Sequence, residues 1–145
     1  MELNKQLKIE GKKVLIVGNR SHKNMWDELI LLGTIKLLQE QWKEIYISAY
    51  NISWLKSFFK QFINVDEIGF LREIPKWFRS FRKFIKDWGR KTIKKYKEMD
   101  SVIVWGGEIL TEELPNNYRY WLVSIFPCLK KHKNIYLMGG IQIPK

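Results

Sequence analysis

Four consecutive apolar residues, Val14–Val17, followed at once by Gly18, constrain this chain more than any other stretch. A continuous apolar run closed by a glycine is typical of a strand that is buried on both faces, as in the middle of a parallel sheet. After a polar loop, Asp27 and Glu28 open an apolar segment over 27–41 whose spacing predicts a helix packed on that sheet. A strand, a glycine, a loop and a helix N-terminus are together the layout of a phosphate or nucleotide site.

The rest of the chain continues the alternation of strands and helices. We expect strands at 44–50, 65–70, 101–110 and 134–140, and helices at 53–62, within 72–97 and at 118–132. Such alternation predicts an α/β fold, and right-handed crossovers favour the strand order 3-2-1-4-5. The expected structure is therefore a single Rossmann-like three-layer domain over 1–145, with a mostly parallel five-stranded sheet and a short extension over 1–12.

In a sheet of this order, the ligand crevice lies beyond the carboxyl ends of the first and fourth strands. The loops 18–27 and 106–117 meet there. Neither contains G-x-G-x-x-G, G-x-x-x-x-G-K-[ST] or G-x-S-x-G, and the second strand ends without an acidic residue for a ribose. We therefore expect no NAD, FAD or P-loop nucleotide, and no α/β-hydrolase chemistry.

Other classes are excluded by what the chain lacks. The single Cys128 allows neither an internal disulfide framework nor a cysteine zinc site, so we expect no metal. The chain has no run of 18 apolar residues, and residues 1–13 lack the apolar core of a secretory signal. We therefore expect a cytoplasmic protein, with peripheral contact at the inner face of the membrane as an option.

Several polar residues in the two loops are candidates for a site. Asn24 precedes Asp27 by three residues, which fits a helix N-cap with a carboxylate in the first turn as well as a binding loop. His22 is either a solvated loop residue or an acid/base or anion contact. Gly106 and Gly107 would let the backbone turn and approach a ligand, and Glu108 after them is either solvated or functional.

Three stretches taken together resemble the polysaccharide pyruvyl transferase family. Members open with a strand, a loop and an Asn-x-Gly-Asp-Glu turn into a helix, similar to Asn24–Glu28 here. They continue with an apolar strand that ends in glycines, similar to 100–107 with Leu110, and later with an apolar strand and a Gly-rich turn closed by proline, similar to 135–144. The order and spacing agree along nearly the whole chain, although Trp26 and Glu108 stand where the family has a glycine and a small residue.

The resemblance implies the N-terminal half of a two-domain, GT-B-like enzyme. Such enzymes join the enolpyruvyl group of phosphoenolpyruvate to two hydroxyls of a cell-surface glycan as a ketal, with no organic cofactor. The implied partners are a glycan or lipid-linked sugar acceptor and a separately encoded C-terminal half, without which the chain would be inactive. The candidates this gives for catalysis are His22, Asp27 and Glu108, and those for substrate binding are Gly18, Asn24, Asp27, Glu28, Gly106 and Gly107.

A second hypothesis comes from the basic segment 72–97. It holds 11 Lys/Arg against Glu73 and Asp87, so it carries +9 of the net charge of +11, and its apolar residues recur at helical spacing. Either its aromatic side packs on the sheet, or the segment is an amphipathic helix that attaches a non-catalytic binding module to an anionic membrane or acidic polymer. The residues that would make that contact are Arg79, Arg82, Lys83 and Lys86.

Two further readings of the whole chain carry less support. Nucleic acid is not expected as a partner, because no nucleic-acid-binding module is present and the charge is confined to one segment. Half of a nucleotide-sugar glycosyltransferase remains an alternative to the pyruvyl transferase reading, but no donor-binding motif marks it.

Overall fold

The computed structural model describes residues 8–18, 25–72, 82–83, 86, 90–110 and 134–141, and the fold below refers to these. Their elements are β1 (Lys13–Val17), α1 (Met25–Glu40), β2 (Glu44–Ala49), α2 (Ile52–Phe59), the 3₁₀ turn η1 (Val65–Glu67), β3 (Ile68–Arg72), α4 (Arg90–Lys97), β4 (Ser101–Leu110) and β5 (Asn134–Ile141). The strands form one sheet in the order β3-β2-β1-β4-β5, and every pair is parallel. The expected α/β fold and strand order are confirmed, and the sheet is wholly rather than mostly parallel.

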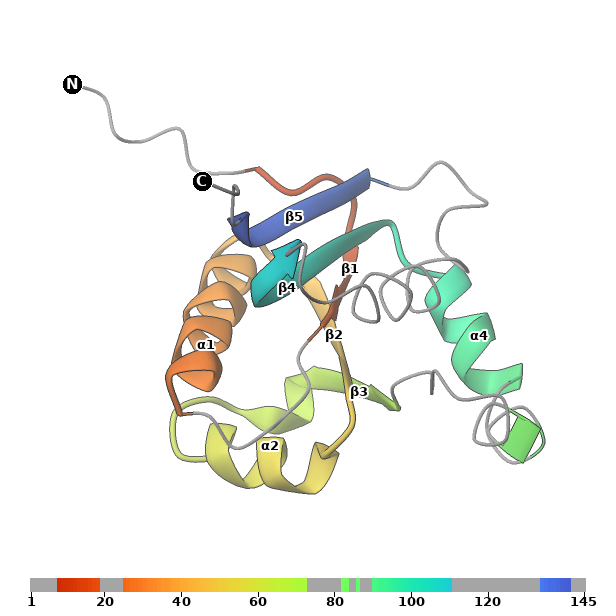
Figure 1. Ribbon diagram of the computed structural model, residues 1–145, viewed down its shortest axis with the longest axis horizontal. Coiled ribbons are helices and arrows are strands. Elements are labelled where there is room, and N and C mark those ends of the chain that lie inside the picture. The colour runs from red at the N-terminus through yellow and green to blue at the C-terminus, as the bar shows by residue number, and fades with distance from the viewer. Residues whose placement is uncertain are drawn as a thin grey trace.

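The central strand β1 explains the three layers. Its side chains alternate between the two faces of the sheet, so Val14 and Ile16 join the core under α1 and α2, whereas Leu15 and Val17 join the core under α4. All four are at most 1% exposed. Figure 1 shows α1 and α4 on opposite faces of the sheet. A strand that must be apolar at every position therefore places a helical layer on each side.

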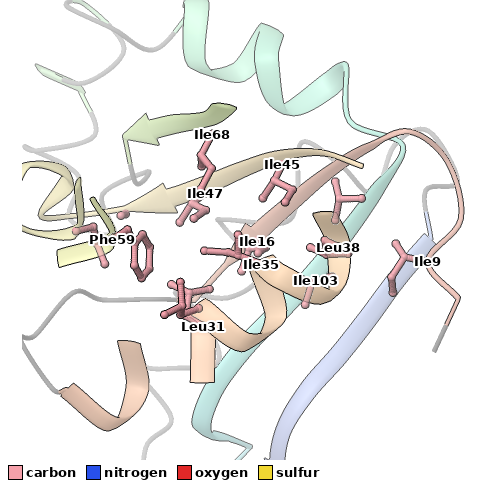
Figure 2. Packing of buried hydrophobic residues seen from close by; sticks show 14 residues of the cluster. Ile9, Ile16, Leu31, Ile35, Leu38, Ile45, Ile47, Phe59, Ile68 and Ile103 are labelled. Carbon is pink, nitrogen blue, oxygen red and sulfur yellow. The ribbon is translucent and has the colours of Figure 1, made fainter. Parts of the chain in front are cut away.

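The larger of the two cores lies between the sheet and α1 and α2. Figure 2 shows Ile16, Ile35 and Ile47 gathered between α1 and the sheet, with Phe59 of α2 beside them. Ile9, from the segment before β1, is also 2% exposed and belongs to this core.

Some element boundaries differ from those expected from the sequence. The segment 65–70 is not one strand, because Asn64 accepts a hydrogen bond from the Asp66 amide and opens η1, so β3 begins only at Ile68. β3 then runs to Arg72, where the basic segment was expected to begin. The helix expected over 53–62 ends at Phe59, which leaves Phe62 47% exposed. The helix expected over 118–132 lies outside the described residues.

The amino edge of the sheet is closed by Asp100, the residue before β4. Its carboxylate accepts hydrogen bonds from the backbone amides of Lys12 and Lys13, both at 2.8 Å. Gly11 has a φ of +75°, and a Cβ there would lie 2.2 Å from the Asp100 Cβ, so only glycine fits this turn. This edge is therefore occupied by the chain itself.

A buried hydrogen bond fastens the second helical layer to the sheet. The hydroxyls of Ser48 on β2 and Tyr96 on α4 lie 2.5 Å apart, and both residues are at most 1% exposed. Tyr96 also contributes its ring to the core beside Leu15 and Val102. The position of α4 is therefore set by both apolar packing and a polar contact that water cannot replace.

We expect Tyr96→Phe to lower the free energy of unfolding by about 1–3 kcal/mol, because it leaves the buried Ser48 hydroxyl without this partner. The double variant Ser48→Ala/Tyr96→Phe removes both polar groups and should recover most of that loss. Urea unfolding followed by circular dichroism measures both. A Tyr96→Phe protein as stable as the wild type would show that this contact contributes nothing.

Candidate functional site

The candidate site lies at the carboxyl edge of the sheet, where β1 and β4 end at different heights. Val17, the last residue of β1, pairs with Val104, and β4 continues beyond it to Leu110 alongside β5. Gly18, directly after β1, has a φ of +100°, a conformation that residues with a side chain rarely adopt. The chain therefore leaves the sheet abruptly at Gly18, while the neighbouring strand projects past it.

The sequence suggested that Gly106 and Gly107 end their strand, but β4 continues past them to Leu110. Trp105 pairs with Met138, but the next pair is Glu108 with Gly140, so β4 has one residue more than β5 over this interval. A second extra residue follows before Leu110 pairs with Ile141. Such bulges bend the strand and redirect its backbone, and they occur often beside functional sites. Gly106 and Gly107 lie inside the first of them.

Glycines are concentrated at this edge. Five of the nine glycines of the chain lie in the carboxyl-terminal half of a strand or directly after one, in three neighbouring strands, namely Gly18, Gly106, Gly107, Gly139 and Gly140. A glycine has no side chain to keep a ligand away from its backbone. Gly18, Gly106 and Gly107 are among the site residues predicted from the sequence. The Gly139-Gly140 pair at the end of a second apolar strand was the signal that could have added β5 to the site.

The first turn of α1 brings two carboxylates to this region. α1 begins at Met25, directly after Asn24, and Asp27 is half-buried. Glu28 is only 1% exposed and lies on the sheet-facing side of the helix with Leu31, Leu32 and Ile35, which are three, four and seven residues further on. The positive end of a helix dipole favours carboxylates at this position. Glu28 is therefore the most deeply placed acid among the site candidates that the structure describes.

Trp26 lies on the other side of the same turn. It is 77% exposed and belongs to the outer side of α1, opposite the residues that face the sheet. Trp26 stands where the family that the sequence resembles has a glycine. The helix directs it outward, so it does not occupy the space between α1 and the sheet.

The remaining predicted site residues are only partly described. His22, Asn24 and Arg79 lie outside the described residues, and Glu108 is described through its backbone pairing with Gly140 alone. Arg82, Lys83 and Lys86 are described and exposed. The structure thus brings Gly18, Gly106 and Gly107 to one edge of the sheet and adds Gly139 and Gly140, but it does not place the basic residues there.

The charged residues that the structure describes at this edge are acidic, and Arg20, His22 and Lys23 of the adjoining loop lie outside the described residues. Within the described residues, the first turn of α1 and the ends of β1, β4 and β5 contain Asp27, Glu28 and Glu108 but no lysine or arginine. A phosphate or carboxylate ligand needs cationic partners, whereas a neutral ligand rich in hydroxyls can donate hydrogen bonds to carboxylates and carbonyls.

Gly18 and Gly33 should respond to alanine with opposite signs. We expect Gly18→Ala to lower the free energy of unfolding by about 1–2 kcal/mol, because its positive φ forces a Cβ into a strained conformation. Gly33 lies within α1, and a Cβ there meets nothing within 4 Å, so Gly33→Ala should raise stability by about 1 kcal/mol. Thermal unfolding of both variants at one low protein concentration measures this, and equal effects would contradict the backbone reading of Gly18.

The comparisons with known proteins identify no relative. No protein-family model, no curated protein and no solved structure matches this chain. In the described ranges, no three His, Cys, Asp or Glu side chains come together in an arrangement able to hold a metal ion. No helix in the same ranges has both the length and the apolar character needed to cross a membrane.

Proposed function

We propose that this chain is a polysaccharide pyruvyl transferase-like domain that forms the acceptor side of a cleft. The observation that carries the proposal is the carboxyl edge of the sheet, with five glycines on three strands and two carboxylates in the first turn of α1. The resemblance of 24–28, 100–110 and 135–144 to the family points to the same edge. The α/β fold with strand order 3-2-1-4-5 is compatible with one Rossmann-like half of such an enzyme.

In this proposal the glycan acceptor lies against the glycine backbone. Asp27, which is half-buried, accepts hydrogen bonds from sugar hydroxyls, and the bulge at Gly106 and Gly107 gives the ring room to approach β4. Glu28, only 1% exposed on the sheet-facing side of α1, is not a direct sugar contact. Among the catalytic candidates, His22 and Glu108 are expected to exchange protons with the reacting hydroxyls.

The donor, phosphoenolpyruvate, carries a phosphate and a carboxylate, and its reaction needs cationic groups and a general acid that protonates the methylene carbon. We propose that a second Rossmann-like half supplies the cationic groups. The 145 residues alone are then expected to bind an acceptor but not to consume phosphoenolpyruvate.

The test is NMR titration of the ¹⁵N-labelled protein with a panel of hexosides that have a free pair of hydroxyls able to close a ketal ring. We expect the amide signals of Gly18, Gly106, Gly107 and Gly140 to shift with at least one sugar, while that of Gly33 stays in place. Phosphate release from phosphoenolpyruvate with the same sugars should remain at the buffer level.

Two controls sharpen this test. Gly107→Val fills the bulge and should abolish the sugar-dependent shifts, whereas Gly33→Ala should keep them. Release of phosphate by the isolated chain would contradict the half-site proposal. If no hexoside shifts any amide at this edge, the chain is not the acceptor side.

A second candidate function is attachment to an anionic membrane, and α4 favours it. Thr92 and Tyr96 face the core, and the exposed positions on the other sides of the helix include Arg90, Lys91, Lys94 and Lys97. Arg82, Lys83 and Lys86 from the same basic segment are exposed as well. A cluster of this kind attracts anionic headgroups, and the attraction weakens as the salt concentration rises.

Lys95 of α4 is paired with an acidic residue of its own chain. Lys95 donates a hydrogen bond from Nζ to Glu98 Oε2 at 3.1 Å, which raises the pKa of Lys95 and lowers the pKa of Glu98. Both groups therefore stay ionised through the neutral range and offset one another at the surface. The membrane contact would rest on the remaining basic residues, so Lys95 is not a useful site for testing it.

Neutralising Arg90, Lys91 and Lys94 to Gln should weaken binding to phosphatidylserine-containing vesicles by about 100-fold at low salt, since each basic residue contributes about 1 kcal/mol. The matched control changes Lys8, Lys36 and Lys60 to Gln, which removes the same charge from exposed positions outside the basic segment. Vesicle flotation across salt concentrations measures both. Equal loss in the two triple variants, or no binding by the wild type, would exclude this function.

A further inference from the structure

Helix α1 has two apolar sides, and only one of them packs on the sheet. Leu31, Ile35 and Leu38 are at most 2% exposed on the inner side. On the opposite side is a second row, which we call the outer stripe, made of Trp26, Ile30, Gly33 and Leu37. Trp26, Ile30 and Leu37 are 77%, 59% and 46% exposed.

The outer stripe has the spacing of a helix-pairing surface. Its residues follow one another at intervals of four, three and four, which average close to the about 3.6 residues of one α-helical turn and so keep them in line along the helix. Met25 and Leu29, 64% and 39% exposed, widen the row on one flank. A contiguous apolar surface of this kind is uncommon on monomeric proteins and marks a site of association.

We propose that two copies of this chain associate through the outer stripe of α1. The two α1 helices lie antiparallel around a two-fold axis that runs between them, level with the midpoint between Leu31 and Leu32. The positions then match in pairs. Trp26 lies opposite Leu37 of the second copy, and Ile30 lies opposite Gly33. A large side chain meets a smaller residue or a glycine at each step, which is the complementarity that a two-fold interface requires.

Gly33 is the residue that makes this contact specific. It lies inside a 16-residue helix, where glycine lowers helix stability. Nothing among the described residues requires a glycine here, because a Cβ at this position meets nothing within 4 Å and its φ is not positive. Close approach of a second helix, with Ile30 of the other copy in the gap, gives the glycine a physical role. A parallel pair would instead set Gly33 against itself and leave that gap unfilled.

The charge distribution also favours this surface for a second copy. The chain carries +11, so two copies repel one another wherever their cationic surfaces meet. α1 holds three carboxylates, Asp27, Glu28 and Glu40, against Lys36 alone. The lysines and arginine of α4 lie on the other face of the sheet (Figure 1). Association through α1 therefore keeps the basic helices of the two copies apart.

The contact is one helix wide, which places it at the small end of protein interfaces. We expect a reversible dimer with a dissociation constant roughly in the micromolar range or above. Sedimentation velocity of the wild-type chain from micromolar to millimolar concentration should show a monomer–dimer equilibrium. A chain that remains monomeric throughout this range would overturn the proposal.

Ile30→Glu places a charge in the middle of the contact and should weaken the dimer at least about tenfold. The matched control is Tyr50→Glu, which puts the same charge on a residue that is 76% exposed but lies after β2, outside α1. It should leave the equilibrium unchanged. If Ile30→Glu has no effect, or if Tyr50→Glu weakens the dimer equally, the outer stripe is not the interface.

A size exchange tests the antiparallel arrangement. Gly33→Ile should weaken the dimer because two isoleucines would then meet, and Ile30→Ala should weaken it because the gap at Gly33 is left unfilled. The double variant Ile30→Ala/Gly33→Ile restores a large residue opposite a small one and should return the dissociation constant to near the wild-type value. Thermal unfolding of each variant at low concentration confirms that the monomer still folds. A Gly33→Ile protein that dimerises as well as the wild type would rule out this pairing.

Discussion

The burial of β1 on both faces is the constraint on which the rest of the structure depends. Val14 and Ile16 must be covered from one side and Leu15 and Val17 from the other, so a single helical layer cannot satisfy the strand. α1 and α2 cover the first face, and α4 covers the second. With β2 and β4 paired to its two edges, β1 becomes the centre of the sheet. The switch in strand order therefore falls between β1 and β4.

That switch point explains why the two edges of the sheet differ. At the amino edge, the Asp100 carboxylate holds the amides of Lys12 and Lys13, and the turn at Gly11 fills the space beside it. At the carboxyl edge, β1 stops at Gly18 while β4 continues through two bulges along β5. The first edge is occupied by the chain, and the second has glycines in or directly after β1, β4 and β5. The proposed acceptor site follows from this asymmetry.

The two helical layers also differ in the charge and the apolar character of their surfaces. The layer of α4 concentrates lysine and arginine, whereas α1 has an outer apolar stripe with more carboxylates than lysines around it. The basic segment could be predicted because lysine and arginine are identified directly from the sequence. The apolar residues of 27–41 were all predicted to pack on the sheet, although Leu29, Ile30 and Leu37 are exposed. A helix that is apolar on both sides gives no periodic signal to separate a core face from an association face.

The sequence by itself determined the sheet. An apolar run closed by glycine, repeated between helical segments, leaves few arrangements that bury every strand, and handedness selects the order β3-β2-β1-β4-β5. Gly18 and Gly106–Gly107 could be chosen as site residues for the same reason. Only the tertiary structure decided that β4 passes through its glycines in bulges opposite Gly139–Gly140, because register depends on the pairing of strands far apart in the chain. It also decided that Glu28 is buried while Trp26 is exposed, since both follow from the side of α1 that the sheet covers.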